Sequence, residues 1–222
     1  MSHQASFSVG CYCADEARCH RSVLRALLKP SSRRPRAHVA FDPQPVLKGT
    51  LLELRPLQPE DFGPLFAVAS DPLVWEQHPE PERHQEGVFR EFFREAIESG
   101  GALVAFERES GRIIGSSRFH AYDPIAREVE VGWTFLGRQY WGGRYNREMK
   151  RLMLEHAFQW VDQVLFIVGS DNRRSQRAVE KIGAVRLRIQ VDARGRECVV
   201  YGITRASFAG DVRTKLMSDG AA

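Results

Sequence analysis

The chain has 222 residues, which is long enough for one domain with a sizeable hydrophobic core and a short appended segment. Its hydrophobic fraction of 43% and its charged fraction of 27% are ordinary for a globular protein. No apolar run approaches the roughly 18 residues that a membrane-spanning helix needs, and the N-terminus lacks the apolar segment of a signal peptide. These features argue against a membrane protein and predict a cytoplasmic location.

The positive charge is concentrated near the N-terminus. Residues 1–50 contain eight Lys and Arg against three Asp and Glu, whereas residues 51–222 contain 24 against 25. Residues 1–45 offer too little apolar surface to offset the entropy of ordering, so we interpret them as a basic, disordered extension. A translation start near Val39, or an arginine-rich arm for acidic partners, are the alternatives. The domain itself, at 46–210 before a loose tail at 211–222, gives little reason to expect nucleic acid as a partner.

Three of the four cysteines lie close together beside a histidine. Cys11, Cys13, Cys19 and His20 form the pattern C-x-C-x5-C-H, and Cys198 stands apart. Zinc ligands usually come in pairs of the form C-x2–4-C, and no second pair follows here. The interpretation is therefore free thiols in a reducing compartment and no metal site, with zinc as the alternative.

The first half of the domain alternates between strand and helix patterns. Residues 51–57 alternate apolar and polar side chains up to Pro56, and a helix follows from Pro59, with proline and acids in its first turn. A polar loop at 70–83 carries Trp75, His78 and Glu80, which we expect at the edge of a cleft. The further expected elements are a helix at 85–98, strands at 102–106 and 113–119 joined by a Ser110-Gly111 turn, and a strand at 128–136.

The second half continues the alternation. The expected elements are a helix at 147–161, a strand at 164–168, a helix at 173–182 that ends at Gly183, and strands at 185–191 and 197–203. His156 lies on the apolar stripe of the first of these helices and is interpreted as a core residue. The order predicts an α/β fold with a mixed, mostly antiparallel central sheet of about seven strands and helices on both faces.

Two glycines stand between the strand at 128–136 and the helix that follows. The first turn of a helix leaves backbone N–H groups unpaired, and the helix dipole adds about half a positive charge there. Gly142 and Gly143 have no Cβ, so a phosphate can approach their backbone closely. The pattern indicates a pyrophosphate site, with a plain turn as the alternative.

Residues 128–183 carry two motifs that resemble those of a known family. Gln139-Tyr140-Trp141-Gly142-Gly143-Arg144 is similar to the Q/R-x-x-G-x-G/A pyrophosphate loop of the GNAT superfamily of N-acetyltransferases. Asn172-x-x-Ser175 followed by Lys181-Ile182-Gly183 is similar to a second motif of that family. From Leu51 to about Phe208 the chain resembles the Rim-type branch, the ribosomal-protein N-terminal acetyltransferases. The resemblance implies an enzyme that transfers an acetyl group from acetyl-CoA to an amine.

The resemblance also implies which residues bind acetyl-CoA. Phe135 and Leu136 are expected to pair with the pantetheine amides like an added strand. The remaining cofactor-binding candidates are Gln139, Gly142, Gly143, Arg144, Tyr145, Asn146 and Asn172. Arg144 departs from the family pattern, which has Gly or Ala there, so its side chain either crowds the phosphates or pairs with them.

The catalytic candidates follow from the chemistry of amine acetylation. The attacking amine must lose a proton, and the resemblance implies Glu130 as the general base, because its family counterpart precedes the same glycine-aromatic pair, here Gly132-Trp133. Glu128, two residues away on the same face, is the fallback. The resemblance implies that a backbone N–H of the strand at 128–136, near Phe135, stabilises the oxyanion. Ser175 resembles the family's proposed proton donor to the leaving thiolate.

The identity of the acceptor is left open between a protein N-terminus and a small molecule. An alternative function is a catalytically inactive acyl-CoA-binding sensor or scaffold. Exposed strand edges after Val185 leave a homodimer possible.

Overall fold

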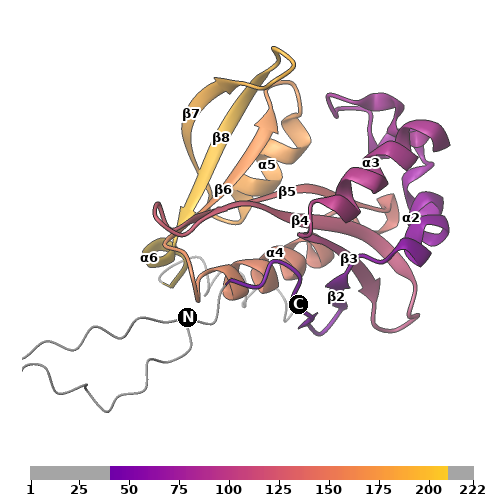
Figure 1. Ribbon diagram of the computed structural model, residues 1–222, viewed down its shortest axis with the longest axis horizontal. Coiled ribbons are helices and arrows are strands. Elements are labelled where there is room, and N and C mark those ends of the chain that lie inside the picture. Colours follow the sequence, from indigo (N-terminus) through magenta and orange to yellow (C-terminus); the bar gives the residue numbers. More distant parts are fainter. Residues whose placement is uncertain (1–40, 210–222) are drawn as a thin grey trace, which may run out of the picture. The chain divides into compact units, whose positions relative to one another are not determined.

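The computed structural model describes residues 41–209, which form one compact unit around a single eight-stranded sheet (Figure 1). The strand order is β1-β2-β3-β4-β5-β6-β8-β7, and every neighbouring pair is antiparallel except β5 and β6. The strands are β1 (Leu47–Lys48), β2 (Leu52–Pro56), β3 (Ala102–Glu107), β4 (Ile113–Asp123), β5 (Glu128–Leu136), β6 (Gln163–Gly169), β7 (Val185–Val191) and β8 (Glu197–Thr204).

Helices cover both faces of this sheet. They are α2 (Phe62–Ala69), α3 (Glu86–Glu98), α4 (Arg144–Ala157), α5 (Arg173–Lys181) and the short α6 (Arg205–Ser207). Figure 1 shows α4 along one face, with α2 and α3 on the other. Within residues 41–209, no helix combines the length and the apolar character that crossing a bilayer requires.

Two hydrophobic clusters correspond to these two faces. The larger one joins Met149 and Met153 of α4 to Leu54, Val131 and Phe166 of the sheet. The other cluster packs α2 and α3 against the sheet through a set of aromatic and aliphatic side chains: Leu65, Phe89, Phe92, Phe93, Val104 and Phe135. The apolar stripes at helical spacing on α3 and α4 are therefore the faces that each helix buries.

The β1–β2 turn is held to α4 by one carboxylate. Glu148 accepts hydrogen bonds from the backbone N–H groups of Thr50, Leu51 and Leu52 at 2.8, 2.7 and 2.9 Å. This one carboxylate accepts from three consecutive backbone donors, so it fixes the edge of the sheet to the helix.

We expect Glu148→Ala to lower the free energy of unfolding by about 2–3 kcal/mol, because partly buried N–H groups would lose their acceptor. Urea denaturation measures this change. Glu155→Ala is the matched control on the same helix, since its ion pair with Arg151 is partly exposed and worth about 1 kcal/mol or less. Equal losses in the two variants would contradict the interpretation.

The parallel pair β5 and β6 diverges soon after it begins. Their register runs only from Glu128 opposite Gln163 to Glu130 opposite Leu165. Beyond that point β6 continues beside β8 as far as Gly169, and Figure 1 shows β6, β7 and β8 turned at a steep angle away from β5. The C-terminal half of β5 therefore has a free edge toward β6.

The predicted fold class is confirmed, with small differences at element ends. The sheet has eight strands rather than about seven, because the two-residue β1 pairs with β2. The helix expected at 147–161 is α4, which begins at Arg144 directly after the glycines and ends at Ala157. The compact unit starts at Phe41, whose ring contacts Phe119 and His156 in the core. The expectations for residues 1–40 and 210–222, including the Cys11, Cys13, Cys19 and His20 cluster, lie outside the described residues.

Candidate active site

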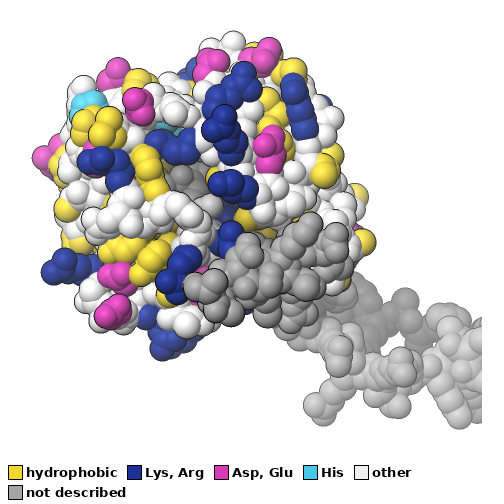
Figure 2. Space-filling model, turned by 180° about the vertical axis from the view of Figure 1, so that it is seen from behind, with side chains coloured by type: hydrophobic (Ala, Val, Ile, Leu, Met, Phe, Trp, Pro, Cys, Tyr) yellow, Lys and Arg dark blue, Asp and Glu magenta, His cyan; other side chains and the backbone are white. Residues whose placement is uncertain are grey.

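A cleft of about 1160 Å³ opens where β5 and β6 separate. Its lining comes from the C-terminal half of β5, the glycine loop, α4, the end of β6, α5 and the loop before α3. Figure 2 shows Lys and Arg side chains gathered around a hollow on one face of the molecule. The cleft is large enough for an extended ligand, and its free strand edge offers backbone hydrogen bonds.

The glycine loop supplies the anion-binding end of the cleft. Gly142 has a φ of 94° and Gly143 a φ of 132°, both in the region that favours glycine. Gly143 is the N-cap of α4, and a Cβ added at Gly142 would meet no atom within 4 Å. Open space directly before a 14-residue helix fits a phosphate, because the first N–H groups of the helix point toward it.

Basic side chains of α5 border the same cleft. Arg173, Arg177 and Lys181 follow one another at a spacing of four residues, so they lie on one face of the helix, and all three line the cleft. Arg174 stacks on Trp141 of the glycine loop with 4.1 Å between its guanidinium carbon and the ring centroid. These side chains add positive charge for a ligand with several phosphates.

A bulge in β5 lies in the middle of the cleft. Trp133 has a φ of 50°, and the register between β4 and β5 shifts there. On the α4 side, Lys150 Nζ donates to Thr134 Oγ1 at 2.5 Å and to Ser117 Oγ at 3.4 Å. Burial lowers the pKa of Lys150 to about 7, since the charged ammonium is removed from water. Lys150 therefore links α4 to the bulged part of β5 through these hydrogen bonds.

Glu130 lies at the point where β5 and β6 part, and it lines the cleft. Burial raises the pKa of its carboxyl to about 7, and the nearby Arg118 guanidinium only partly offsets this effect. A carboxylate with a pKa near 7 takes up a proton more readily at neutral pH than an ordinary glutamate does. The geometry and the pKa together suit a general base.

The N-terminus of α5 forms the opposite wall. Asn172 is buried and caps the helix, because its side-chain oxygen accepts a hydrogen bond from Ser175 N at 3.0 Å. Both residues line the cleft. The cap uses the backbone N–H of Ser175 rather than its hydroxyl, so the hydroxyl is available to the cleft.

A family model of the acetyltransferase (GNAT) domain matches residues 52–185. The chain belongs to the GNAT acetyltransferase family. A second model, described as the active DUF488-N3 subclade, matches residues 1–32, outside the described part of this GNAT protein. No curated protein matches the chain.

Solved structures share the fold of this GNAT domain. A putative acetyltransferase from T. thermophilus is 27% identical, with a TM-score of 0.64, over 78% of this chain and 96% of that one. A GCN5-related N-acetyltransferase from Brucella melitensis is 17% identical, with a TM-score of 0.70, over 79% and 87%. Mycobacterium smegmatis RimJ, solved with CoA-disulfide, is 16% identical, with a TM-score of 0.60, over 80% and 94%. The last two likenesses bear on the fold alone.

Most of the residues predicted from the sequence meet in the cleft of the GNAT domain. Those that line it are Glu130, Phe135, Leu136, Gly142, Gly143, Asn146, Asn172 and Ser175.

Four other residues predicted from the sequence lie outside the cleft lining. Gln139 is exposed beside a second hollow, Arg144 is outside the cleft lining, and Glu128 does not reach the cleft. Tyr145 is also outside the lining: its hydroxyl donates to Glu107 Oε1 at 2.7 Å, and its ring packs on Tyr140.

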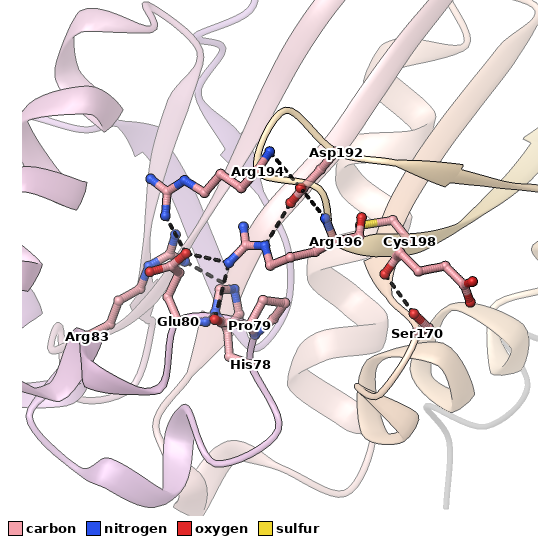
Figure 3. A network of polar contacts seen from close by, with 10 residues as sticks. His78, Pro79, Glu80, Arg83, Ser170, Asp192, Arg194, Arg196 and Cys198 are labelled. Carbon is pink, nitrogen blue, oxygen red and sulfur yellow. Dashed lines mark hydrogen bonds and ion pairs between the residues drawn. The ribbon is translucent and has the colours of Figure 1, made fainter.

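The loop at 70–83 closes the far end of the cleft. Trp75 and His78 line it as expected, but Trp75 is buried rather than near the surface, because its indole N–H donates to Ala69 O at 2.7 Å. Glu80 does not line the cleft. It pairs with Arg194 and Arg196 of the β7–β8 turn, and this network ties the loop to the turn (Figure 3).

Several cleft residues were not identified from the sequence. The basic stripe of α5 was visible as a repeat at a spacing of four, which is the signal for one helix face. Lys150 gave no signal, because a single lysine in a helix is normally exposed and only the packing of α4 buries it. Arg83 also gave no signal, and this half-buried side chain lines the cleft only because the loop before α3 packs there.

Proposed function

We propose that this GNAT domain transfers an acetyl group from acetyl-CoA to a primary amine. The proposal rests on Glu130. This residue lies where β5 and β6 separate, and the pKa of its carboxyl is raised to about 7. The α-amine of a peptide N-terminus has a pKa of about 7.7–8.0, so a base with a pKa near 7 suits its deprotonation.

The cleft has a feature for each part of acetyl-CoA. The backbone N–H groups at Gly143 and the first turn of α4 would hold the diphosphate, with Asn146 and the basic stripe of α5 beside them. The free edge of β5 at Phe135 and Leu136 would pair with the pantetheine amides. Asn172 would hold the pantetheine from the opposite wall. Arg144 is exposed and lies outside the cleft lining, which favours a side chain that folds away from the proposed phosphate space.

The proposed reaction needs one proton acceptor and one proton donor. The amine nitrogen forms a bond to the thioester carbon, and the carbon–sulfur bond then breaks. Glu130 takes the proton that the amine loses, directly or through water, and Ser175 returns a proton to the departing thiolate. A backbone N–H near Phe135, beside the bulge at Trp133, would stabilise the oxyanion in between.

Calorimetric titration of the full chain with acetyl-CoA tests the proposal, together with an assay of free thiol over a panel of primary amines. We expect saturable binding that raises the melting temperature, and release of CoA with at least one amine. Absence of binding at millimolar acetyl-CoA would refute the proposal. Tight binding with no turnover across the panel would favour the inactive acyl-CoA-binding alternative.

The Rim-type assignment also belongs to this proposal. RimJ is among the structural neighbours, but at an identity that supports the fold alone. The proposal therefore keeps both acceptor classes, a protein N-terminus and a small amine.

The cytoplasmic location and the homodimer remain predictions. Among residues 41–209, no group of three or more His, Cys, Asp and Glu is placed to hold a metal ion.

A further inference from the structure

Arg118 is a buried cation with an unused hydrogen-bonding edge. Its side chain lies on β4, and the residue is only 5% exposed. The Nε and Nη2 atoms have no hydrogen-bond partner among residues 41–209. These two nitrogens share one edge of the guanidinium, and their parallel N–H bonds match the two oxygens of a carboxylate.

A second arginine lies on the same aromatic ring. The Arg118 guanidinium carbon is 5.8 Å from the centroid of Phe92, and that of Arg83 is 4.3 Å from it. Each guanidinium also lies near a tryptophan ring. The guanidinium carbon of Arg118 is 4.7 Å from the centroid of Trp133, and that of Arg83 is 5.5 Å from the centroid of Trp75. Neither guanidinium forms an ion pair with any carboxylate of residues 41–209.

Arg118, Arg83 and the neighbouring His78 form a cluster in which hydrogen-bond donors outnumber acceptors. His78 Nε2 lies 3.1 Å from Arg83 Nη1, and His78 Nδ1 lies 2.9 Å from the backbone nitrogen of Glu80 (Figure 3). Burial, followed by the charges of Arg83 and Arg196, lowers the pKa of His78 to about 3, so the imidazole is neutral. A neutral imidazole accepts at one nitrogen only, so one of these two donors has no acceptor there.

Both arginines keep their charge at neutral pH. Burial lowers the pKa of each to about 10, which is still well above 7. The carboxylates whose charge reaches them are Glu95, Glu130 and Glu80. Glu80 is already paired with Arg194 and Arg196. The cluster therefore holds more positive than negative charge, with Arg118 buried and Arg83 and His78 half-buried.

The cluster adjoins the proposed reaction centre. In the pairing of β4 and β5, Arg118 lies opposite Gly132, and His120 lies opposite Glu130. Arg118 and Glu130 are thus diagonal neighbours on adjacent strands, about 7–8 Å apart at their Cα atoms. Arg83, Glu130 and Trp133 line the cleft, and Arg118 lies behind this lining, with its guanidinium carbon 4.7 Å from the centroid of the Trp133 ring. A ligand group bound by Arg118 would leave an attached amine within reach of Glu130.

We propose that the acceptor is a primary amine that also carries a carboxylate, and that Arg118, with Arg83, binds this carboxylate. The inference rests on the proposed acetyl transfer and names its substrate class. A buried guanidinium without a partner is unfavourable in the free protein, whereas a bidentate carboxylate satisfies both N–H groups and the charge. A polyamine would place further positive charge beside two arginines, so it is disfavoured.

The carboxylate has two possible sources, and the test separates them. Full-length protein saturated with CoA is titrated calorimetrically with matched pairs of amines. Phenylalanine against phenylalaninamide tests the α-carboxylate of a free amino acid. The C-terminally amidated dipeptides Asp-Ala against Asn-Ala, and Ala-Asp against Ala-Asn, test a side-chain carboxylate at a protein N-terminus. Spermidine tests a purely cationic amine.

We expect the carboxylate member of at least one pair to bind at least 10-fold more tightly than its amide, and spermidine to bind no better than the amides. Arg118→Gln should abolish that preference while leaving the Kd for CoA unchanged. The matched control is Arg90→Gln, because Arg90 also lies over a phenylalanine, Phe62, but is exposed and paired with Glu86. Equal binding within every pair, or a preference that survives Arg118→Gln, would overturn the inference.

Stability gives a second readout that a purely structural arginine would not share. Without ligand, Arg118→Met should raise the melting temperature, because it removes an unpaired buried charge while filling similar space. A clear fall in melting temperature, or failure of both Arg118 variants to fold, would assign the residue a structural role and overturn the inference.

These measurements distinguish the two proposals. Carboxylate binding that depends on Arg118, in a protein that acetylates no amine, would refute acetyl transfer and leave the carboxylate site standing. Acetylation of amines and amides alike, without any carboxylate preference, would support acetyl transfer and overturn the carboxylate site.

Discussion

Glu130→Gln is expected to lower kcat by about 10²–10⁴-fold at pH 7, the range typical for loss of a general base. Glutamine keeps the size and polarity of the side chain but cannot accept the proton from the amine. Steady-state release of free CoA measures the change, with the best acceptor from the amine panel. The Kd for acetyl-CoA should stay close to that of the unmodified protein, since the proposed cofactor contacts lie on the glycine loop and the β5 edge.

The pH dependence of the reaction gives an independent check on Glu130. Burial raises the pKa of the carboxyl to about 7, and only the deprotonated form accepts a proton. In the unmodified protein kcat/KM should therefore rise as the pH increases through about 7, and this inflection should disappear in Glu130→Gln. Between the ordinary glutamate pKa and about 7, the folded state binds more protons than the unfolded state, so this group's contribution to stability falls as the pH rises.

Glu128→Gln is the matched control, because Glu128 lies on the same strand two residues away but does not line the cleft. It should retain activity within a few-fold of the unmodified protein. Loss of activity in Glu128→Gln with none in Glu130→Gln would transfer the role of base to Glu128. Retained activity in both variants would mean that no carboxylate of this strand acts as the base.

Gly143→Ala is expected to weaken acetyl-CoA binding by about 10- to 100-fold. The loss corresponds to one charge-assisted hydrogen bond of about 1.5–3 kcal/mol. The φ of 132° disfavours a side chain, and the added Cβ would enter the space proposed for the diphosphate, where the nearest atom is Arg147 Nη2 at 3.9 Å. Calorimetry with acetyl-CoA measures the change, and kcat at saturating acetyl-CoA should change much less.

Gly111→Ala separates loss of the phosphate site from general strain. Gly111 also has a positive φ, 67°, and has no atom within 4 Å of an added Cβ, but it lies in the β3–β4 turn away from the cleft. Both variants should lose some stability from backbone strain, and only Gly143→Ala should lose affinity. Equal acetyl-CoA affinity in the two variants would place the diphosphate somewhere other than the glycine loop.

Local patterns predicted most of the fold. The strand at 128–136, the glycine pair and the N-cap Asn172 each leave a signal within a few residues, because backbone conformation and capping depend on near neighbours. The alternation of strands and helices then predicted a mixed sheet. The two-residue β1 was missed, since so short a strand has no periodicity and exists only through its pairing with β2.

The candidate site was predicted less completely. The sequence indicated that Gly142, Gly143, Glu130 and Ser175 belong to one site, and the structure places all four in one cleft. The sequence also suggested Gln139, the first residue of the loop motif, and Tyr145, the residue directly after it. Both lie outside the cleft lining. The direction of a side chain in a turn depends on the turn's geometry and on its packing partners, and Glu107 supplies that partner for Tyr145.

The sequence by itself determined the fold class and the family, and it predicted the open glycine loop before α4, because these rest on local conformation and on motifs of contiguous residues. Only the tertiary structure decided the charge state of the site. Burial gives Glu130 and Lys150 their shifted pKa values, and packing of α3 leaves Arg118 without a partner among the described residues. Desolvation is a property of residues distant in the chain that meet in space, so it has no signature in the order of the amino acids.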